Sequence, residues 1–314
     1  MGVSTAAPRV TTDRWLRPLG WATLVSNMVL VVTGGAVRLT GSGLGCPTWP
    51  NCTSDSLVPT SEYAQHGAIE FTNRMLTVVL TAIVLATLLA VLRSDRRDLT
   101  PFAVAAFVGI PAQAVLGGIT VLTGLNPWTV AAHFLLSMVI LAITTTMATR
   151  AYQPPGPARV IVNPSLVTLI RVLVGVTAVV LVLGTVVTGS GPHAGDVDVP
   201  RTGFDPETVS QLHADAVMLL LGLTAATLLW LRGSKAPPAA TRAAAVLLVV
   251  ELAQGLIGFV QYFTGLPVLL VGFHLLGACL VWIAALRLLL ATSTRLPAPA
   301  TGPVTAVTEQ YVAR

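Results

Sequence analysis

Runs of about twenty apolar residues recur along the whole chain, and they limit the possible folds more than any other sequence feature. An apolar helix of about 20 residues spans the hydrocarbon core of a bilayer. Charged residues make up only 10% of the 314 residues, against roughly 25% in soluble proteins. The sequence therefore predicts an all-α membrane protein with eight transmembrane helices. The expected spans lie near residues 16–37, 70–92, 101–123, 128–149, 167–187, 207–231, 243–263 and 268–291.

The positive charges gather on one side of these spans. Of the 18 Lys and Arg residues, only Arg38, Arg74 and Arg201 fall on the opposite side. The positive-inside rule places the richer side in the cytoplasm, so both termini are expected there. The net charge of +5 is therefore a topology signal, and no nucleic acid is expected as a partner.

An internal repeat divides the spans into two sets of four. Residues 112–117 (AQAVLG) match residues 253–258 (AQGLIG), and His133 matches His274, all at an offset of 141 positions. Because four spans per repeat is an even number, both halves enter the membrane with the same polarity. We expect two four-helix bundles related by a pseudo-twofold axis along the membrane normal, that is, a parallel repeat.

The repeat and the composition together predict five segments and two long outer loops. The tail is rich in Pro, Ala and Thr, a composition typical of disorder. The loops near residues 38–69 and 188–206 should lie on the outer face. The predicted segments are a cytoplasmic N-terminal segment 1–14, an N-terminal half 15–150, a cytoplasmic linker 151–166, a C-terminal half 167–291 and a disordered cytoplasmic tail 292–314.

Three histidines fall at similar depth within the outer parts of the spans. His133 and His274 lie about six residues inside the fourth and eighth spans, roughly 9 Å deep, and His213 lies near the outer end of the sixth. A single histidine in a bilayer is often only hydrogen-bonded to a neighbouring helix, but three at one depth indicate a site. Two facing imidazoles can bind a haem iron from both sides, as His213 and His274 would do in the C-terminal half.

The N-terminal half lacks one of these ligands. His133 has its counterpart in His274, but Asn73 stands where His213 would be expected. Glu70 lies one turn before Asn73, and Arg74 follows it. A haem site with one ligand and a nearby carboxylate suggests a substrate site, whereas a site with two ligands suggests an electron-transfer cofactor. The alternative for Glu70 and Arg74 is a plain ion pair between positions i and i+4.

Cys46 and Cys52 share the first outer loop. The compartment outside the membrane permits disulfides, and the short separation is easily closed. The alternative, a metal site, lacks further ligands at suitable spacing. The sequence therefore favours a disulfide.

Several short motifs, in a specific order and spacing, make the sequence resemble the haem A synthase family over about residues 15–291. The marks are GG at 34–35, RLTGSG at 38–43, CPTWPNC at 46–52 and IEFTNR at 69–74, followed by the three histidines in their helices. The resemblance implies a bacterial plasma-membrane oxidoreductase that converts the C8 methyl of haem O to a formyl group. Successive hydroxylations and a dehydration would yield haem A for terminal oxidases.

The resemblance also implies roles for single residues. His213 and His274 would ligate a permanent haem b, and Glu70 would be the catalytic carboxylate of the substrate pocket. A disulfide between Cys46 and Cys52 is implied as well.

One position departs from the family pattern. The family's common motif has His where this chain has Asn73, beside Arg74. His133 is then the only in-register ligand of the substrate haem. His66 lies on the same helical face as Asn73 but about 10 Å away along the axis, so it would serve only if the start of the second helix bends inward.

Partners and rival functions complete these expectations. The expected partners are haem O, a haem O synthase, an electron acceptor, the lipid bilayer and a second copy of the chain. A non-catalytic di-haem electron carrier resembling cytochrome b is the first rival, and it would make no formyl product from haem O. A transporter is the second, and it would need polar residues reaching both faces.

Overall fold

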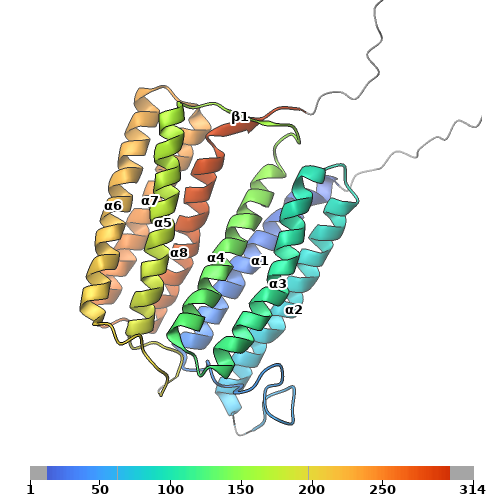
Figure 1. Ribbon diagram of the computed structural model, residues 1–314, viewed down its shortest axis with the longest axis vertical. Helices are drawn as coiled ribbons and strands as arrows, with labels where there is room; N and C mark the ends of the chain where they lie inside the picture. The colour runs from blue at the N-terminus through green and yellow to red at the C-terminus, as the bar shows by residue number, and fades with distance from the viewer. Residues whose placement is uncertain (1–12, 62, 197, 298–314) are drawn as a thin grey trace, which may run out of the picture.

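In the part of the chain that the structure describes, eight long helices form two four-helix bundles (Figure 1). The computed structural model describes residues 13–61, 63–196 and 198–297. The N-terminal bundle consists of α1 (Asp13–Leu39), α2 (Ala64–Leu92), α3 (Thr100–Leu122), preceded by the short 3₁₀ helix η1 (Arg97–Leu99), and α4 (Pro127–Arg150). The C-terminal bundle consists of α5 (Pro164–Ser190), α6 (Pro206–Gly233), α7 (Pro238–Phe263) and α8 (Val268–Leu290).

All eight helices are long and apolar enough to cross a bilayer, which confirms the predicted spans. The start of the second helix was predicted wrongly. It begins at Ala64 rather than near residue 70, so His66 lies within α2 and not before it. The physical reason is that an apolar run marks only the part of a helix inside hydrocarbon, whereas the helix itself continues into the polar interface.

Local sequence signals fix where several helices begin. The Asn126 side chain accepts a hydrogen bond from the backbone N–H of Trp128 (3.0 Å), and the Asp205 carboxylate accepts one from that of Thr208 (2.8 Å). Such caps satisfy backbone donors that lack a partner in the first turn. The side-chain and backbone hydrogen bonds from Thr208 also lower the pKa of the Asp205 carboxyl. A proline follows each cap at the first helical position, where its missing N–H costs nothing.

Two buried apolar clusters, one in each bundle, lie near the α4–α5 linker at one end of the bundles. In the C-terminal bundle, Leu166 at the start of α5, Leu231 at the end of α6 and Leu288 at the end of α8 are fully buried together. In the N-terminal bundle, Leu99 and Met147 form a similar cluster. The opposite ends of the helices are therefore left to enclose a site.

The two bundles meet along α8, which packs against α1 and α4, and along the α4–α5 contact. The indole N–H of Trp282 in α8 donates to the backbone carbonyl of Met138 in α4 (2.8 Å). A Cβ atom at Gly35 of α1 would collide with a terminal methyl group of Leu275 in α8, so this glycine makes room for the leucine side chain. Small residues at such crossings let membrane helices pack tightly.

A two-stranded antiparallel sheet joins the linker to the segment after α8. It pairs β1 (Ala158–Val160) with β2 (Ser293–Arg295). The first residues of the predicted tail, 292–297, are therefore ordered, because their backbone groups find partners in the linker. The remainder of that tail, 298–314, and residues 1–12 of the predicted N-terminal segment lie outside the described residues.

The first and last described residues lie at the same end of the molecule, where α1 and α5 also begin (Figure 1). This arrangement agrees with an even number of crossings and with two halves of equal polarity. Assigning this end to the cytoplasm remains a prediction from the distribution of positive charges.

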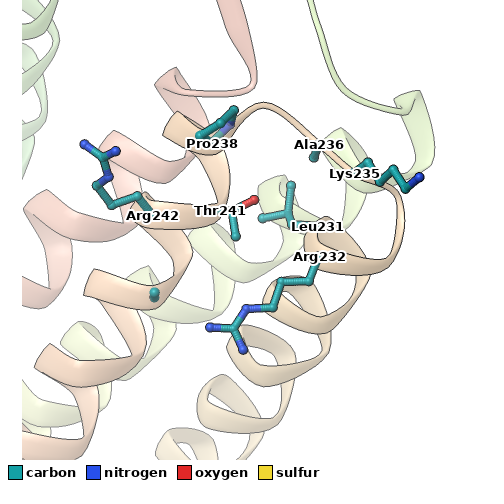
Figure 2. A pocket seen from close by; sticks show the side chains of 8 residues that line it. Leu231, Arg232, Lys235, Ala236, Pro238, Thr241 and Arg242 are labelled. Atoms are coloured by element: carbon teal, nitrogen blue, oxygen red, sulfur yellow. The ribbon is translucent and has the colours of Figure 1, made fainter.

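The same end carries a shallow hollow of about 500 Å³ at the α6–α7 turn. Arg232, Lys235 and Arg242 lie around it, but their charged groups point in different directions in Figure 2. Because these cations do not converge, the hollow has no arrangement for binding a single anion. The hollow belongs to the end of the molecule that the distribution of positive charges predicts to be cytoplasmic.

We predict that two introduced cysteines will label from opposite sides of the membrane. Asp55→Cys in the α1–α2 loop and Lys235→Cys in the α6–α7 turn are both at exposed positions. In a Cys279→Ala background, a membrane-impermeant maleimide should label position 55 in intact spheroplasts and position 235 only after the membrane is opened. Labelling of position 235 from outside, with position 55 protected, would contradict the predicted orientation.

Candidate functional site

A cavity of about 1400 Å³ occupies the end of the bundles opposite the sheet. All eight helices line it, together with the α1–α2 and α5–α6 loops. Pockets for single small ligands usually measure roughly 300–1,000 Å³. The cavity therefore has room for more than one bulky ligand.

Two histidines line the part of this cavity that belongs to the C-terminal bundle. His213 comes from α6 and His274 from α8, and each of these helices packs against α5 and α7. The two helices thus stand diagonally across the bundle, which leaves its centre between them. A flat ring system placed at this centre would meet a histidine from each side.

The N-terminal bundle repeats this diagonal arrangement with one substitution. His133 of α4 and Asn73 of α2 line the cavity, and both helices pack against α1 and α3. The structure therefore places Asn73 where a second histidine would complete the pair. Only one imidazole faces this half of the cavity.

A glycine on the neighbouring helix faces each of these four side chains. A Cβ atom at Gly117 would lie 3.0 Å from Cε1 of His133, and one at Gly258 would lie 3.2 Å from Cε1 of His274. At Gly184 the distance to Cε1 of His213 would be 3.4 Å, and at Gly34 the distance to Nδ2 of Asn73 would be 3.8 Å. The missing side chains let the polar groups lie against the bundle wall and leave its centre free.

Two repeat-related glutamines fix the helices that carry histidine. The amide of Gln113 donates to the carbonyl of His133 (3.2 Å), and the amide of Gln254 donates to the carbonyl of His274 (2.7 Å). The rings themselves are not held in this way. The Nδ1 atoms of three imidazoles are buried and have no hydrogen-bond partner among the described residues, namely those of His133, His213 and His274.

These features fit a porphyrin. Diagonal imidazoles and a centre kept open by glycines are what a clamped haem requires. In the C-terminal bundle His213 and His274 would hold such a group from two sides. In the N-terminal bundle His133 would hold one from a single side.

Glu70 lies at the edge of the N-terminal part of the cavity and is only 6% exposed. Its Oε1 accepts a hydrogen bond from Arg74 (2.6 Å), so the ion pair expected as an alternative is present. Its Oε2 accepts from the backbone N–H of Cys46 (2.7 Å). Glu70 therefore forms the ion pair and also lies on the cavity wall.

The loop around Cys46 is held firmly against α2. Cys46 and Cys52 form a buried disulfide, which confirms that prediction. Arg74 donates to the carbonyls of Cys46 (3.1 Å) and Thr48 (3.2 Å). The side chain of Trp49 packs on Gly118 of α3, where a Cβ atom would overlap the indole. Trp49 thereby covers one side of the N-terminal part of the cavity.

His66 does not take the place suggested for it. It is exposed, its Nδ1 is hydrogen-bonded to the hydroxyl of Ser42 (2.9 Å), and it is not among the residues that line the cavity. Because α2 is already helical at this residue, its start does not bend inward. His66 is therefore not placed to bind a haem in this cavity.

Several contributors to the site were not identified from the sequence. Gln113, Gln254, Gly117 and Gly258 all belong to the repeated segment, so repetition was a signal that could have revealed them. Trp49 offered no comparable signal, because its contact with Gly118 joins a loop to a distant helix.

Known proteins resemble this chain along most of its length. The profile of the COX15-CtaA family, described as cytochrome oxidase assembly protein, matches residues 17–286. Heme A synthase of Listeria welshimeri is 34% identical over 138 residues, which are 42% of this chain and 45% of that protein. The corresponding match in Bacillus mycoides is 32% identical over 135 residues, 41% of this chain and 42% of that protein.

These first relatives are thus matched over less than half of their length, whereas another relative is matched almost throughout. Heme A synthase of Bacillus cereus is 23% identical over 303 residues, 91% of this chain and 96% of that protein. Because the family profile covers residues 17–286 of the 314, the chain belongs to the COX15-CtaA family of cytochrome oxidase assembly proteins.

Proposed function

We propose that this protein is a haem A synthase, an oxidoreductase that converts the C8 methyl of haem O to a formyl group through successive hydroxylations and a dehydration. The observation that carries the proposal is the asymmetry between the two diagonal pairs. His213 and His274 form a complete pair, whereas His133 faces Asn73 beside the buried Glu70. Family membership and the Bacillus cereus relative support the same activity.

The C-terminal bundle is the proposed site of a resident haem b. His213 and His274 would be its axial ligands, and Gln254 would fix the position of α8 at His274 through its hydrogen bond to that backbone. A haem with two imidazole ligands supplies one-electron redox chemistry. Ser210 stands at the position equivalent to Glu70, so this half has no matching carboxylate.

The N-terminal bundle is the proposed site of the substrate, haem O. His133 would orient the substrate through its iron, and Trp49 would cover the pocket. Glu70 is held in one orientation by Arg74 and by the Cys46 N–H, which uses two of the roughly four acceptor positions of a carboxylate. The remaining positions can bind water beside the methyl group. The negative charge can also stabilise positive charge that develops at the methyl carbon.

The proposed haem A synthase activity implies a haem donor, an electron acceptor and a membrane location. Haem O would come from a haem O synthase, and the electrons removed from the methyl group would leave through an electron acceptor. The enzyme would act in a bacterial plasma membrane, with the two long loops on the outer face and with self-association as a further interaction.

Replacing either His213 or His274 with Ala should remove a low-spin haem b signal from the purified protein. Loss of one imidazole opens a coordination position, which changes the spin state and weakens retention of the haem. Optical spectra and the haem content after extraction would measure this change. An unchanged low-spin spectrum in both variants would exclude this pair as ligands.

Glu70→Gln should lower haem A formation by about 10²-fold or more, the usual effect of removing a positioned acid–base group. The amide has nearly the same shape, but it carries no charge and can accept from only one of its two present donors. Haem O should accumulate while the haem b spectrum stays intact, as judged by chromatography of extracted haems. Asp55→Asn, at an exposed position of the α1–α2 loop, is the matched charge control.

A normal level of haem A in Glu70→Gln would place the chemistry elsewhere. Absence of any formyl product in the unmodified protein supplied with haem O would favour the di-haem electron carrier instead.

Asn73→His should complete the second diagonal pair. In the unmodified protein, the N-terminal haem would have one imidazole ligand and should bind added cyanide or imidazole readily. In the variant, a new imidazole opposite Gly34 should give a second low-spin species in electron paramagnetic resonance spectra. His133→Ala in the variant should abolish that species. A variant spectrum without the new species would show that Asn73 and His133 do not face one haem.

A further inference from the structure

Arg38 is a cation that the protein does not neutralise. It lies at the end of α1 and lines the cavity, and its Nη2 donates to the carbonyl of Thr188 (2.7 Å). Its Nε is buried without a partner among the described residues. No carboxylate in the described part of the chain forms an ion pair with it.

Arg38 is half-buried with its Nε fully enclosed, and a charge that is partly withdrawn from water is costly unless an opposite charge compensates it. In a cavity built for ligands, the missing partner of Arg38 is most simply an anionic group of a ligand. The planar guanidinium matches a carboxylate, which can accept two parallel N–H hydrogen bonds. The chemistry of Arg38 therefore points to a ligand carboxylate.

The position of Arg38 relates it to the histidine pair of the other bundle. Thr188 lies one turn beyond Gly184 on α5, and Gly184 faces the ring of His213. At 1.5 Å per residue, the guanidinium is about 6 Å further along the helix, towards the loop end of the cavity. A haem bears two propionate carboxylates on one edge. Burying these charged groups in hydrocarbon is costly in free energy. The polar edge would therefore point towards the loops and reach Arg38.

The α5–α6 loop covers this arginine. The N–H of Gly43 donates to the carbonyl of Gly195 (3.0 Å), which joins the two long loops. A Cβ atom at Gly195, whose φ is +112°, would lie 3.6 Å from Cγ of Arg38. Exclusion of water by this loop would strengthen an interaction between the guanidinium and a carboxylate.

We propose that Arg38 binds a propionate carboxylate of the haem clamped between His213 and His274. The N-terminal bundle would then supply a binding residue to the site in the C-terminal bundle, and Arg38 would set which edge of the porphyrin faces the loops. This inference rests on the proposed function, because it needs a haem at the histidine pair.

The test compares iron protoporphyrin IX with its dimethyl ester, which lacks both negative charges. Full-length protein from haem-deficient cells would be titrated in detergent, and the low-spin Soret band would report binding. The unmodified protein should bind the free acid at least about tenfold more tightly, as expected for a charged hydrogen bond. In Arg38→Gln the two porphyrins should bind with similar affinity, and Arg38→Lys should keep part of the preference.

Arg201→Gln is the matched control. Its guanidinium already donates to the carbonyls of Val199 (2.8 Å) and Pro192 (3.2 Å), and it does not line the cavity. This variant should retain the preference for the free acid. If Arg38→Gln does not fold, the affinities for the free acid and for the ester can still be compared in the unmodified protein and in Arg38→Lys.

Two results would overturn the inference while leaving the proposed function intact. One is equal binding of acid and ester by the unmodified protein, and the other is a full preference in Arg38→Gln. Failure of the unmodified protein to form any low-spin haem would instead contradict the proposed function, and the inference with it.

Discussion

Contact between a glycine and a polar side chain on the next helix recurs in all four helix hairpins. The contact lets a ring or amide lie against the bundle wall, because glycine offers no side chain to displace it. Each bundle can then project two polar groups towards a common centre from diagonal helices. A larger residue at such a position would push the facing group into the space that the cavity needs. The contacts are Gly34 with Asn73, Gly117 with His133, Gly184 with His213 and Gly258 with His274.

An open centre is compatible with a stable bundle because apolar clusters near the linker hold the helices together, whereas the histidines and Asn73 lie towards the loop ends of their helices. Lipid tails are as apolar as leucine, so membrane helices associate through close packing rather than through the hydrophobic effect. Ala240 and Ala244 on α7 are fully buried near the linker and allow that packing. With the bundles held together there, the loop ends can separate enough to form the cavity.

The two halves share a scaffold but differ in their polar groups. Glu70 and Arg74 hold the disulfide loop over the N-terminal half, where Asn73 replaces the second imidazole. Two imidazoles face the C-terminal half, and Ser210 stands at the position equivalent to Glu70. In the proposed function, this difference separates the site of the substrate haem from the site of the resident haem. Arg38 extends from the first half to the second, so the halves are not independent sites.

The sequence by itself determined the eight spans, the division into two halves and the likeness of His133 to His274, because apolar length and repetition are local properties of the chain. It also indicated the disulfide, since its two cysteines are close in sequence. Only the tertiary structure decided that diagonal helices bring His213 towards His274. Only the structure shows that His66 lies outside the cavity and that residues 293–295 pair with the linker. Only the structure shows that no described carboxylate pairs with Arg38. These features depend on contacts between distant segments, and hydrophobic periodicity carries no information about such contacts.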